Sequence, residues 1–215
     1  MVMMDSMPDG LSQRIMPNIL YIIYSCLFLK TLVFFCINGG YKMTKKTIMD
    51  EAQIKRAVTR MAHEILEKHK GPEDIVILGV KTRGEHLAKR IQERIVAIEG
   101  VKVPVGTIDT SAYRDDRPAD IDTKDAIVSE GDYSKKHVVI VDDVLETGRT
   151  IRAAIDAILN KARPRTISLA ILVDRGHREL PIRPDYIGKN IPTSKTEKVI
   201  VLLEEYDGES SVTIQ

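Results

Sequence analysis

The sequence predicts an α/β domain with a central, mostly parallel β-sheet flanked by helices. Two observations predict it. Residues 75–80 and 138–141 are apolar runs too short and too β-branched for helices, and an amphipathic helical pattern follows each. Strands that alternate with helices form βαβ units around a buried parallel sheet. The 215 residues allow one such domain, and a net charge of +1 excludes wholesale binding to polyanions.

Residues 1–42 differ from the rest of the chain. They hold all three Phe and both Cys residues, and residues 19–37 are almost wholly apolar. This run of roughly 19 residues is near the ~20 that span a bilayer, so a membrane anchor is one interpretation. A secretory signal is a second, disfavoured because its basic start is thin. We favour a third: residues 1–42 are not part of the functional protein, and residues 43–215 form a cysteine-free, cytoplasmic domain without membrane association.

A helix is predicted from Asp50 to the Gly-Pro pair at residues 71–72. Asp50 and Gln53 have the spacing of a capping box, and an apolar stripe of period 3.6 follows from Ile54 onward. The opposite face is polar, and its spacing alone predicts only a solvated surface: Arg56, Thr59, Arg60, His63 and Glu67.

The strand at residues 75–80 ends in a short basic loop, Lys81, Thr82 and Arg83, before a helix with an apolar stripe. Two cations and a hydroxyl at the carboxyl end of a strand favour an anion site, although a plain charged turn has the same composition. Residues 101–108 predict the next strand. Residues 109–136 are charged and poor in apolar side chains, which is typical of a lid or a disordered loop.

Residues 138–150, VVIVDDVLETGRT, carry the most specific signal. Asp142 and Asp143 fall at the carboxyl end of a strand, where open α/β sheets bind ligands. A Thr-Gly-Arg-Thr turn then enters a helix, whose N–H groups and dipole favour a phosphate monoester. Two carboxylates would repel that phosphate but can accept hydrogen bonds from ribose hydroxyls. The alternative is a solvated turn with a helix cap, which the ordered spacing makes less favourable.

Further strands are predicted at residues 168–173, 199–203 and 212–214. Between residues 161 and 198, nine Lys and Arg stand against four Asp and Glu, a local surplus of five positive charges. Such side chains can contact RNA phosphates and unpaired bases, although any single one of them would ordinarily be a solvated surface residue.

VVIVDDVLETGRT resembles the phosphoribosyl-diphosphate (PRPP) motif of type I phosphoribosyltransferases. The segments IKRAVTRMAHEI, LGVKTRGEHLAKRI, YRDD and LVDRGHRELPIRPDYIGKNIPTSKTEKV extend the resemblance over residues 43–215, to the pyrimidine operon attenuator family. It implies the type I phosphoribosyltransferase fold, with a small hood after Asp174 and a flexible loop that includes Arg114.

The resemblance also implies a reaction, in which uracil and PRPP give UMP and diphosphate. Mg²⁺ would be bound mainly through PRPP, without a dedicated metal site on the protein. Asp142, Asp143 and Arg114 would be catalytic. The residues implied to bind PRPP are Lys81, Thr82, Arg83, Asp142, Asp143, Thr147, Gly148, Arg149 and Thr150.

A second implied activity is binding of the pyr mRNA leader, dependent on UMP or UTP, which causes transcription attenuation. The family further implies a homodimer or higher homo-oligomer and no binding to DNA. The implied RNA surface combines one helix face with the hood: Thr59, Arg60, His63, His177, Arg178, Arg183 and Lys189.

Glu146 departs from the family, in which an aromatic residue is expected at this position. Its charge would weaken PRPP binding if the side chain points inward. One alternative is therefore a nucleotide-sensing, RNA-binding regulator with little enzymatic activity. Another is a salvage phosphoribosyltransferase for a different base, with an incidental basic surface.

Overall fold

The computed structural model describes residues 46–111 and 131–215, all within Lys45–Gln215, one of two units into which the chain divides. The predictions for residues 1–42 and for Arg114 fall outside the described residues. The elements are, in chain order, β1 (Lys46–Met49), α2 (Glu51–His69), β2 (Ile75–Val80), α3 (Arg83–Glu99), β3 (Val105–Ile108), β4 (His137–Leu145), α4 (Arg149–Lys161), β5 (Thr166–Asp174), β6 (Tyr186–Asn190), β7 (Val199–Leu202), α5 (Glu204–Asp207) and β8 (Ser211–Ile214).

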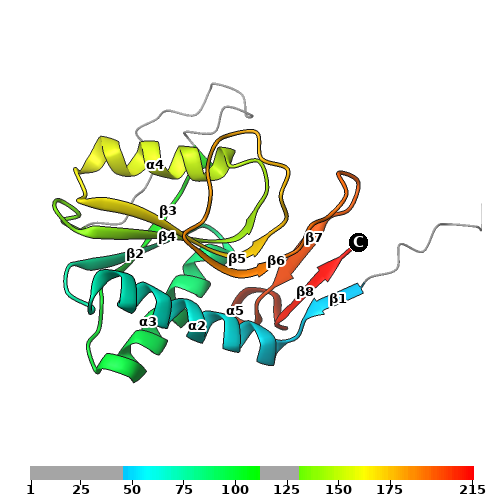
Figure 1. Cartoon of the computed structure of the whole chain (residues 1–215), viewed down its shortest axis with the longest axis horizontal. Coiled ribbons are helices and arrows are strands. Elements are labelled where there is room, and N and C mark those ends of the chain that lie inside the picture. Colours follow the sequence, from blue (N-terminus) through cyan, green and yellow to red (C-terminus); the bar gives the residue numbers. More distant parts are fainter. Residues whose placement is uncertain (1–45, 112–130) are drawn as a thin grey trace, which may run out of the picture. The chain divides into compact units, whose positions relative to one another are not determined.

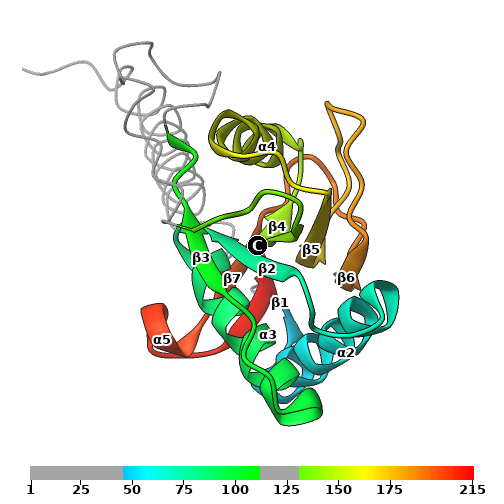
Figure 2. The same ribbon diagram turned by 90° about the vertical axis from the view of Figure 1, so that its left-hand side faces the viewer.

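The main sheet has five strands in the order β3-β2-β4-β5-β6, and every neighbouring pair is parallel. In its centre Val139 pairs with Ile77 on one side and Ser168 on the other. Helix α4 covers one face, while α2 and α3 cover the other (Figures 1 and 2). The predicted fold class, a mostly parallel sheet between helices, is confirmed.

Alternate residues of the buried strands supply two separate cores. Ile77, Val139 and Ala170 belong to the core beneath α2 and α3, whereas Leu78 and Ile140 belong to the core beneath α4. Side chains of this kind contribute roughly 1.5–3 kcal/mol each when fully buried. Because both faces are covered, the strands are continuous apolar runs, and this is why the sequence predicts them well.

The predicted capping box is present at the start of α2. The backbone N–H of Gln53 donates to Asp50 Oδ1 at 2.7 Å, and the N–H of Asp50 donates to Gln53 Oε1 at 2.9 Å. The two largest differences from the predicted strand boundaries are in β3 and β4. Strand β3 begins only at Val105, because Pro104 has no N–H for the ladder, and β4 continues through the two aspartates to Leu145.

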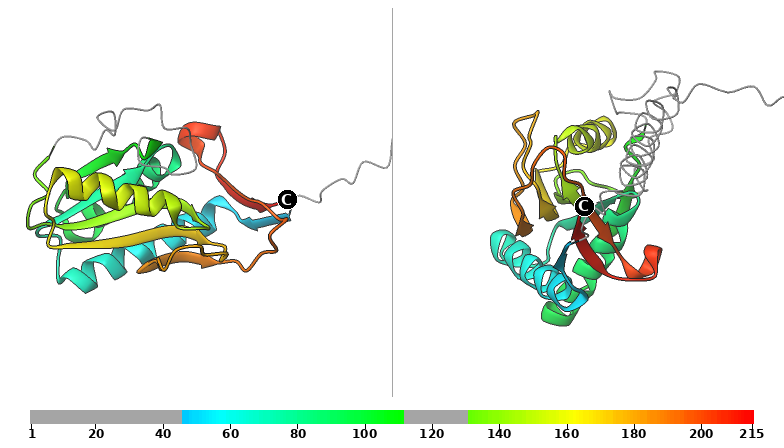
Figure 3. Two further views of the ribbon diagram at one scale, coloured as in Figure 1. Left: turned by 90° about the horizontal axis from the view of Figure 1, so that it is seen from above. Right: turned by 90° about the vertical axis from the view of Figure 1, so that its right-hand side faces the viewer.

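A second, antiparallel sheet in the order β1-β8-β7 lies beside the carboxyl ends of β4 and β5 (Figures 1 and 3). It joins the start of the described chain to its end, with Lys46 opposite Ile214. Strands β1 and β6 and the single-turn helix α5 were not predicted, because segments of four or five residues carry too little periodicity. None of the helices in residues 46–111 and 131–215 is long and apolar enough to cross a bilayer.

Two glycines allow α3 to approach the sheet closely. A Cβ on Gly79 would lie 2.4 Å from the carbonyl oxygen of Gly84, and a Cβ on Gly84 would lie 2.4 Å from the carbonyl oxygen of Val141. Real Cβ atoms do not come this near to backbone atoms, so α3 can occupy its position only because both residues lack a side chain. This contact fixes the loop between β2 and α3 beside β4.

We therefore expect Gly84→Ala to destabilise the fold by about 1–3 kcal/mol, because the added methyl group must displace α3 from β4. Urea unfolding would measure the change as a lower midpoint at an unchanged slope. Lys89→Ala, at an exposed position of the same helix, serves as the control and should change stability by less than about 0.5 kcal/mol. A Gly84→Ala protein as stable as the parent would contradict the close approach.

A histidine pair lies at the opposite end of the sheet from the β4–α4 turn. The His69 and His137 rings are 4.6 Å apart, and the Tyr186 hydroxyl lies 3.3 Å from His69 Nε2. Burial, together with the charges of His137 and Lys68, holds the pKa of His69 below its ordinary value. The folded state therefore favours the neutral imidazole.

This shift predicts a pH-dependent stability. As the pH falls below about 6.5, the unfolded chain binds a proton at His69 before the folded chain does, so the free energy of unfolding decreases. We expect His69→Gln to lose part of the decrease that the parent shows between pH 7 and pH 5.5, as measured by urea unfolding across that range. Identical pH profiles for parent and variant would refute the assignment.

Candidate active site

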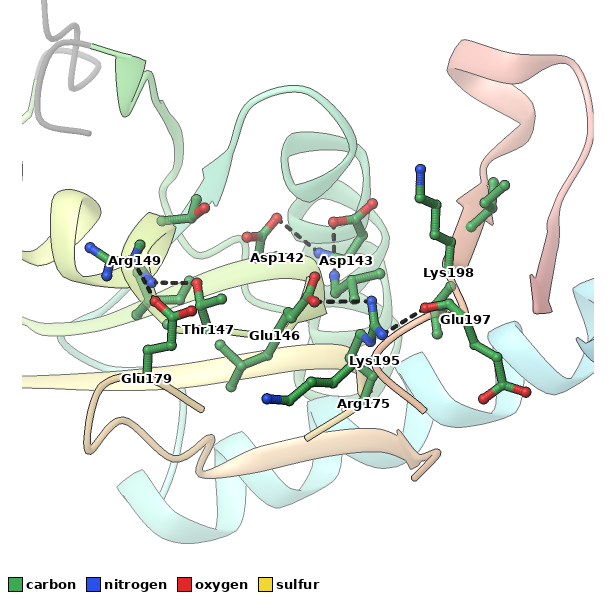
Figure 4. A pocket seen from close by; sticks show the side chains of 17 residues that line it. Asp142, Asp143, Glu146, Thr147, Arg149, Arg175, Glu179, Lys195, Glu197 and Lys198 are labelled. Atoms are coloured by element: carbon green, nitrogen blue, oxygen red, sulfur yellow. Dashed lines mark hydrogen bonds and ion pairs between the residues drawn. The ribbon is translucent and has the colours of Figure 1, made fainter. Parts of the chain in front are cut away.

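A pocket of about 710 Å³ opens where β4 turns into α4. Figure 4 shows side chains from three parts of the chain around it: the end of β4 and the start of α4, the segment after β5, and the segment that enters β7. The structure places six of the nine predicted PRPP-binding residues in its lining: Asp142, Asp143, Thr147, Gly148, Arg149 and Thr150.

The two aspartates lie side by side at the base of the pocket (Figure 4). Asp142 Oδ1 accepts the backbone N–H of Asp143 at 2.9 Å, and Asp143 Oδ1 accepts that of Val144 at 2.8 Å. Burial raises the pKa of Asp143, and the Val144 N–H and the charge of Arg83 oppose this rise only in part. Because these backbone donors orient the carboxyl groups, their remaining oxygen lone pairs can accept hydrogen bonds from hydroxyls.

The turn into α4 has the backbone of an anion-binding loop. Gly148 is the N-cap residue at φ 91°, a conformation that side chains disfavour, and it has no side chain to cap the helix. Thr147 Oγ1 accepts the Arg149 N–H at 3.3 Å, and the Arg149 guanidinium pairs with Glu179 at 2.7 Å. The N–H groups and dipole at this helix start provide a site for a phosphate.

The second predicted anion loop lies at the same edge of the sheet, because Gly84 packs on Val141. Its Lys81-Thr82 peptide bond is cis, and Lys81 Nζ lies 3.5 Å from Asp109. Lys81, Thr82 and Arg83 do not line the 710 Å³ pocket. The structure therefore places this loop near the aspartates, but among the described residues the loop and the pocket do not form one cavity.

Arg83 does not point freely into solvent. Its Nε and Nη2 donate to the two carboxylate oxygens of Asp207 in α5, at 2.9 and 2.7 Å. These hydrogen bonds raise the pKa of Arg83 and lower that of Asp207. A pyrophosphate in this loop would therefore have to share Arg83 with Asp207 or take it from that carboxylate.

Three basic residues of the pocket were not predicted as site residues: Arg175, Lys195 and Lys198. Arg175 is only 5% exposed; it donates to Thr193 Oγ1 and to the carbonyl oxygens of Ser194 and Glu197. The two lysines belong to the basic run of the sequence, but only the fold shows that their segment folds back over the end of β4.

Glu146, the departure from the expected motif, has a partner in the structure. Its carboxylate lies 3.1 Å from Nη1 of Arg175 (Figure 4). Its side chain is 47% exposed, so solvent screens this pair. The negative charge that the sequence places beside the phosphate loop is thus partly balanced by a buried guanidinium.

The predicted RNA-binding face of α2 lies beside β6. Arg60 Nη2 donates to the carbonyl oxygens of Ile187 and Gly188, each at 2.8 Å, and Nη1 pairs with Glu64. The Thr59 hydroxyl donates to the carbonyl oxygen of Lys55, and His63 is exposed. The structure therefore brings this helix face to the edge strand that follows the hood, as the predicted RNA surface requires.

The four predicted RNA residues after β5 have different environments. Arg183 is exposed, whereas Lys189 Nζ donates to the carbonyl oxygen of Ile48 at 3.0 Å. His177 has φ 63°, and its Nε2 donates to the carbonyl oxygen of Thr193. Arg178 is largely enclosed by backbone carbonyl groups. A second pocket, of about 560 Å³, is lined by His177, Arg178 and Arg183 among others.

A family and its members match this chain. The phosphoribosyl transferase domain matches residues 45–207. Bifunctional protein PyrR of Staphylococcus aureus strain bovine RF122 / ET3-1 is 57% identical over 175 residues, which cover 80% of this chain and 100% of that protein. The protein of the same name from strain JH9 matches with the same identity and coverage.

Solved structures show the same fold. The hypoxanthine phosphoribosyltransferase of Trypanosoma cruzi has a TM-score of 0.62 at 19% identity, over 81% of this chain and 98% of that one. A hypoxanthine-guanine phosphoribosyltransferase from Bacillus anthracis has a TM-score of 0.59 at 19% identity, over 78% and 96%. The comparisons show that this chain belongs to the PyrR family of phosphoribosyltransferase-domain proteins.

Proposed function

We propose that this protein is a bifunctional pyrimidine regulator: it makes UMP and diphosphate from uracil and PRPP, and it binds the pyr mRNA leader in response to uridine nucleotides. The observation that carries the enzymatic half is the pocket in which two oriented carboxyl groups adjoin an anion-binding helix start. The identity to PyrR proteins supports the combination of two activities.

In the proposed reaction, N1 of uracil attacks C1 of the ribose, the bond from C1 to the diphosphate oxygen breaks, and the N1 proton is lost to solvent or base. Positive charge develops on the ribose at the transition state, so catalysis is mainly positioning and electrostatic stabilisation. Asp142 and Asp143 would hold the ribose 2′ and 3′ hydroxyls. The turn from Thr147 to Thr150 would hold the 5′-phosphate, and the Lys81–Arg83 loop the diphosphate.

The oxygen-rich end of β4 fits a hard cation. No group of three or more His, Cys, Asp or Glu side chains able to hold a metal occurs in the described part of the chain. Mg²⁺ would therefore be bound mainly through PRPP oxygens and water, next to the carboxylates of Asp142 and Asp143. When bound, Mg²⁺ supplies charge neutralisation for the leaving diphosphate.

The RNA-binding half rests on the face formed by α2, β6 and the hood. Arg60 joins α2 to β6, and exposed Arg183 and His63 offer groups for phosphates and unpaired bases. We further propose that the functional domain is residues 43–215, which acts in the cytoplasm as a homodimer or larger homo-oligomer. Mass spectrometry of the natural N-terminus would test the bounds of the functional domain, and light scattering would test the oligomeric state.

A base-competition assay tests the enzymatic half. Purified protein with PRPP and Mg²⁺ should convert uracil to UMP faster than it converts hypoxanthine or guanine. Preference for a purine would support a salvage enzyme for another base. RNA binding without measurable turnover of any base would support a regulator that only senses nucleotides.

Asp143→Asn should lower kcat/KM for UMP formation about 10- to 100-fold, because it replaces an oriented carboxyl group that would bind a ribose hydroxyl, an interaction worth roughly 1.5–3 kcal/mol. Steady-state kinetics with PRPP as the varied substrate would measure the loss. Asp156→Asn, in the ion pair with Arg152 on α4, is the control and should remain near the parent value. An unaffected Asp143→Asn enzyme would remove Asp143 from the site.

Glu146→Gln should lower the KM for PRPP about 2- to 5-fold, because it removes a negative charge from the edge of the phosphate loop. Salt should reduce the difference, since the group is partly exposed. Glu209→Gln, an exposed residue outside the pocket lining, controls for net charge. A higher KM in Glu146→Gln would instead mean that Glu146 is needed to hold Arg175 in place.

A further inference from the structure

Arg178 is one of two enclosed arginines, with Arg175, in the hood, the segment between β5 and β6 at residues 175–185. Its Nη1 donates to the carbonyl oxygens of Glu146 at 2.9 Å and of Leu145 and Gly176 at 3.2 Å. Its Nε donates to the carbonyl oxygen of Ile182 at 3.0 Å, and its Nη2 pairs with Asp174. Every guanidinium nitrogen therefore has a partner, and the side chain is 21% exposed.

The backbone acceptors of Arg178 belong to two segments of the chain, the end of β4 and the hood. Leu145 and Glu146 directly precede Thr147, the start of the turn proposed to hold the phosphate. Ile182 directly precedes Arg183, an exposed residue of the proposed RNA face. One planar side chain thus bonds at the same time to the backbone of the nucleotide site and to the backbone that carries an RNA-facing arginine.

Other hydrogen bonds tie the hood to the same turn. The backbone N–H groups of Glu179 and Leu180 both donate to the carbonyl oxygen of Thr147, at 3.0 and 3.2 Å. The side chains of Leu180 and Ile182 come within 3.5 Å of the position that a Cβ on Gly148 would occupy. If residues 146–148 move when a phosphate binds, these contacts would consequently displace residues 178–182.

The two pockets share a wall. Arg175 lines both the 710 Å³ pocket and the 560 Å³ pocket of the hood, and Arg178 lines the latter while it bonds to the backbone of the former. The hood pocket is also lined by Arg183 and Asn190, which are both exposed. The proposed RNA-binding groups of the hood pocket are therefore separated from the proposed nucleotide site by the wall that Arg175 and Arg178 form.

We infer that Arg178 is a positioning residue that couples occupancy of the phosphate turn to the arrangement of the RNA face, and that it is not itself an RNA contact. The inference rests on the proposed function and names the connection between its two halves. The planar guanidinium group of an arginine can hold several carbonyl groups in fixed directions and so connect the two segments. The ammonium group of a lysine is a flexible point charge and cannot. Each ligand should then tighten binding of the other by the same factor.

Arg178→Lys separates this role from direct contact with RNA, because it keeps the positive charge and removes the planar guanidinium group. The readout is the ratio of the RNA dissociation constants without and with UMP, measured with the leader RNA of the protein's own pyrimidine genes at fixed salt. We expect the ratio to fall at least about 5-fold, at the lower end of common allosteric coupling. Arg183→Lys, the matched control, should keep the ratio within about 2-fold of the parent.

The dependence of RNA binding on salt supplies a second readout. A residue that contacts an RNA phosphate contributes about one unit to the slope of log affinity against log salt, so its replacement by alanine lowers that slope by about 1. We expect Arg183→Ala to show this loss and Arg178→Ala not to. A lowered slope in Arg178→Ala, with an unchanged UMP ratio in Arg178→Lys, would overturn the inference.

Hydrogen exchange in the parent protein keeps the test independent of any variant that folds poorly. UMP should slow exchange of the Glu179 and Leu180 amides, which donate to the phosphate turn, and saturating RNA should slow the same amides. If UMP changes the RNA affinity but leaves hydrogen exchange in the hood unchanged, the role assigned to Arg178 is overturned while the proposed function stands. A parent protein that makes UMP but binds no leader RNA would overturn the RNA half of the proposed function as well.

Discussion

The close contact between helix α3 and the main sheet is the constraint on which the site depends. Gly79 and Gly84 leave no room for a side chain, so α3 lies directly on β2 and β4. The loop between β2 and α3 is thereby held at the same edge of the sheet as Asp142 and Asp143. A ligand with a phosphate and a diphosphate on one sugar could reach both loops only because this edge is so compact.

The hood is bonded to the backbone on two sides of the pocket. Arginines in the hood bond chiefly to backbone: Arg175 secures the segment that enters β7, and Arg178 secures the turn into α4. Buried guanidinium groups need such partners, since an unpaired charge in an enclosed site is costly. The same hydrogen bonds connect the hood to the phosphate turn, which would give the proposed nucleotide-dependent RNA binding a physical basis.

Much of this architecture could be predicted from the sequence, because buried parallel strands are apolar runs and because the capping box and the PRPP motif are local patterns. Two strands of the small antiparallel sheet, β7 and β8, could also be predicted, but β1, with four residues, and the pairing of the three strands could not. Nor could the bonds of Arg60 to Ile187, of Arg83 to Asp207 and of Arg178 to Glu146, because these partners lie far away along the chain. Basic residues look alike in a sequence, and only the fold distinguishes Arg183, which is exposed, from Arg178, which is enclosed.

The measurement that tests the central claim most directly is a gel-shift titration of residues 43–215 against the leader RNA of its own pyrimidine genes, with and without UMP at one stated salt concentration. If one nucleotide site serves catalysis and regulation, UMP should tighten RNA binding about 5-fold or more. No binding in either condition, or equal binding in both, would contradict the account and leave at most a salvage phosphoribosyltransferase with a basic surface.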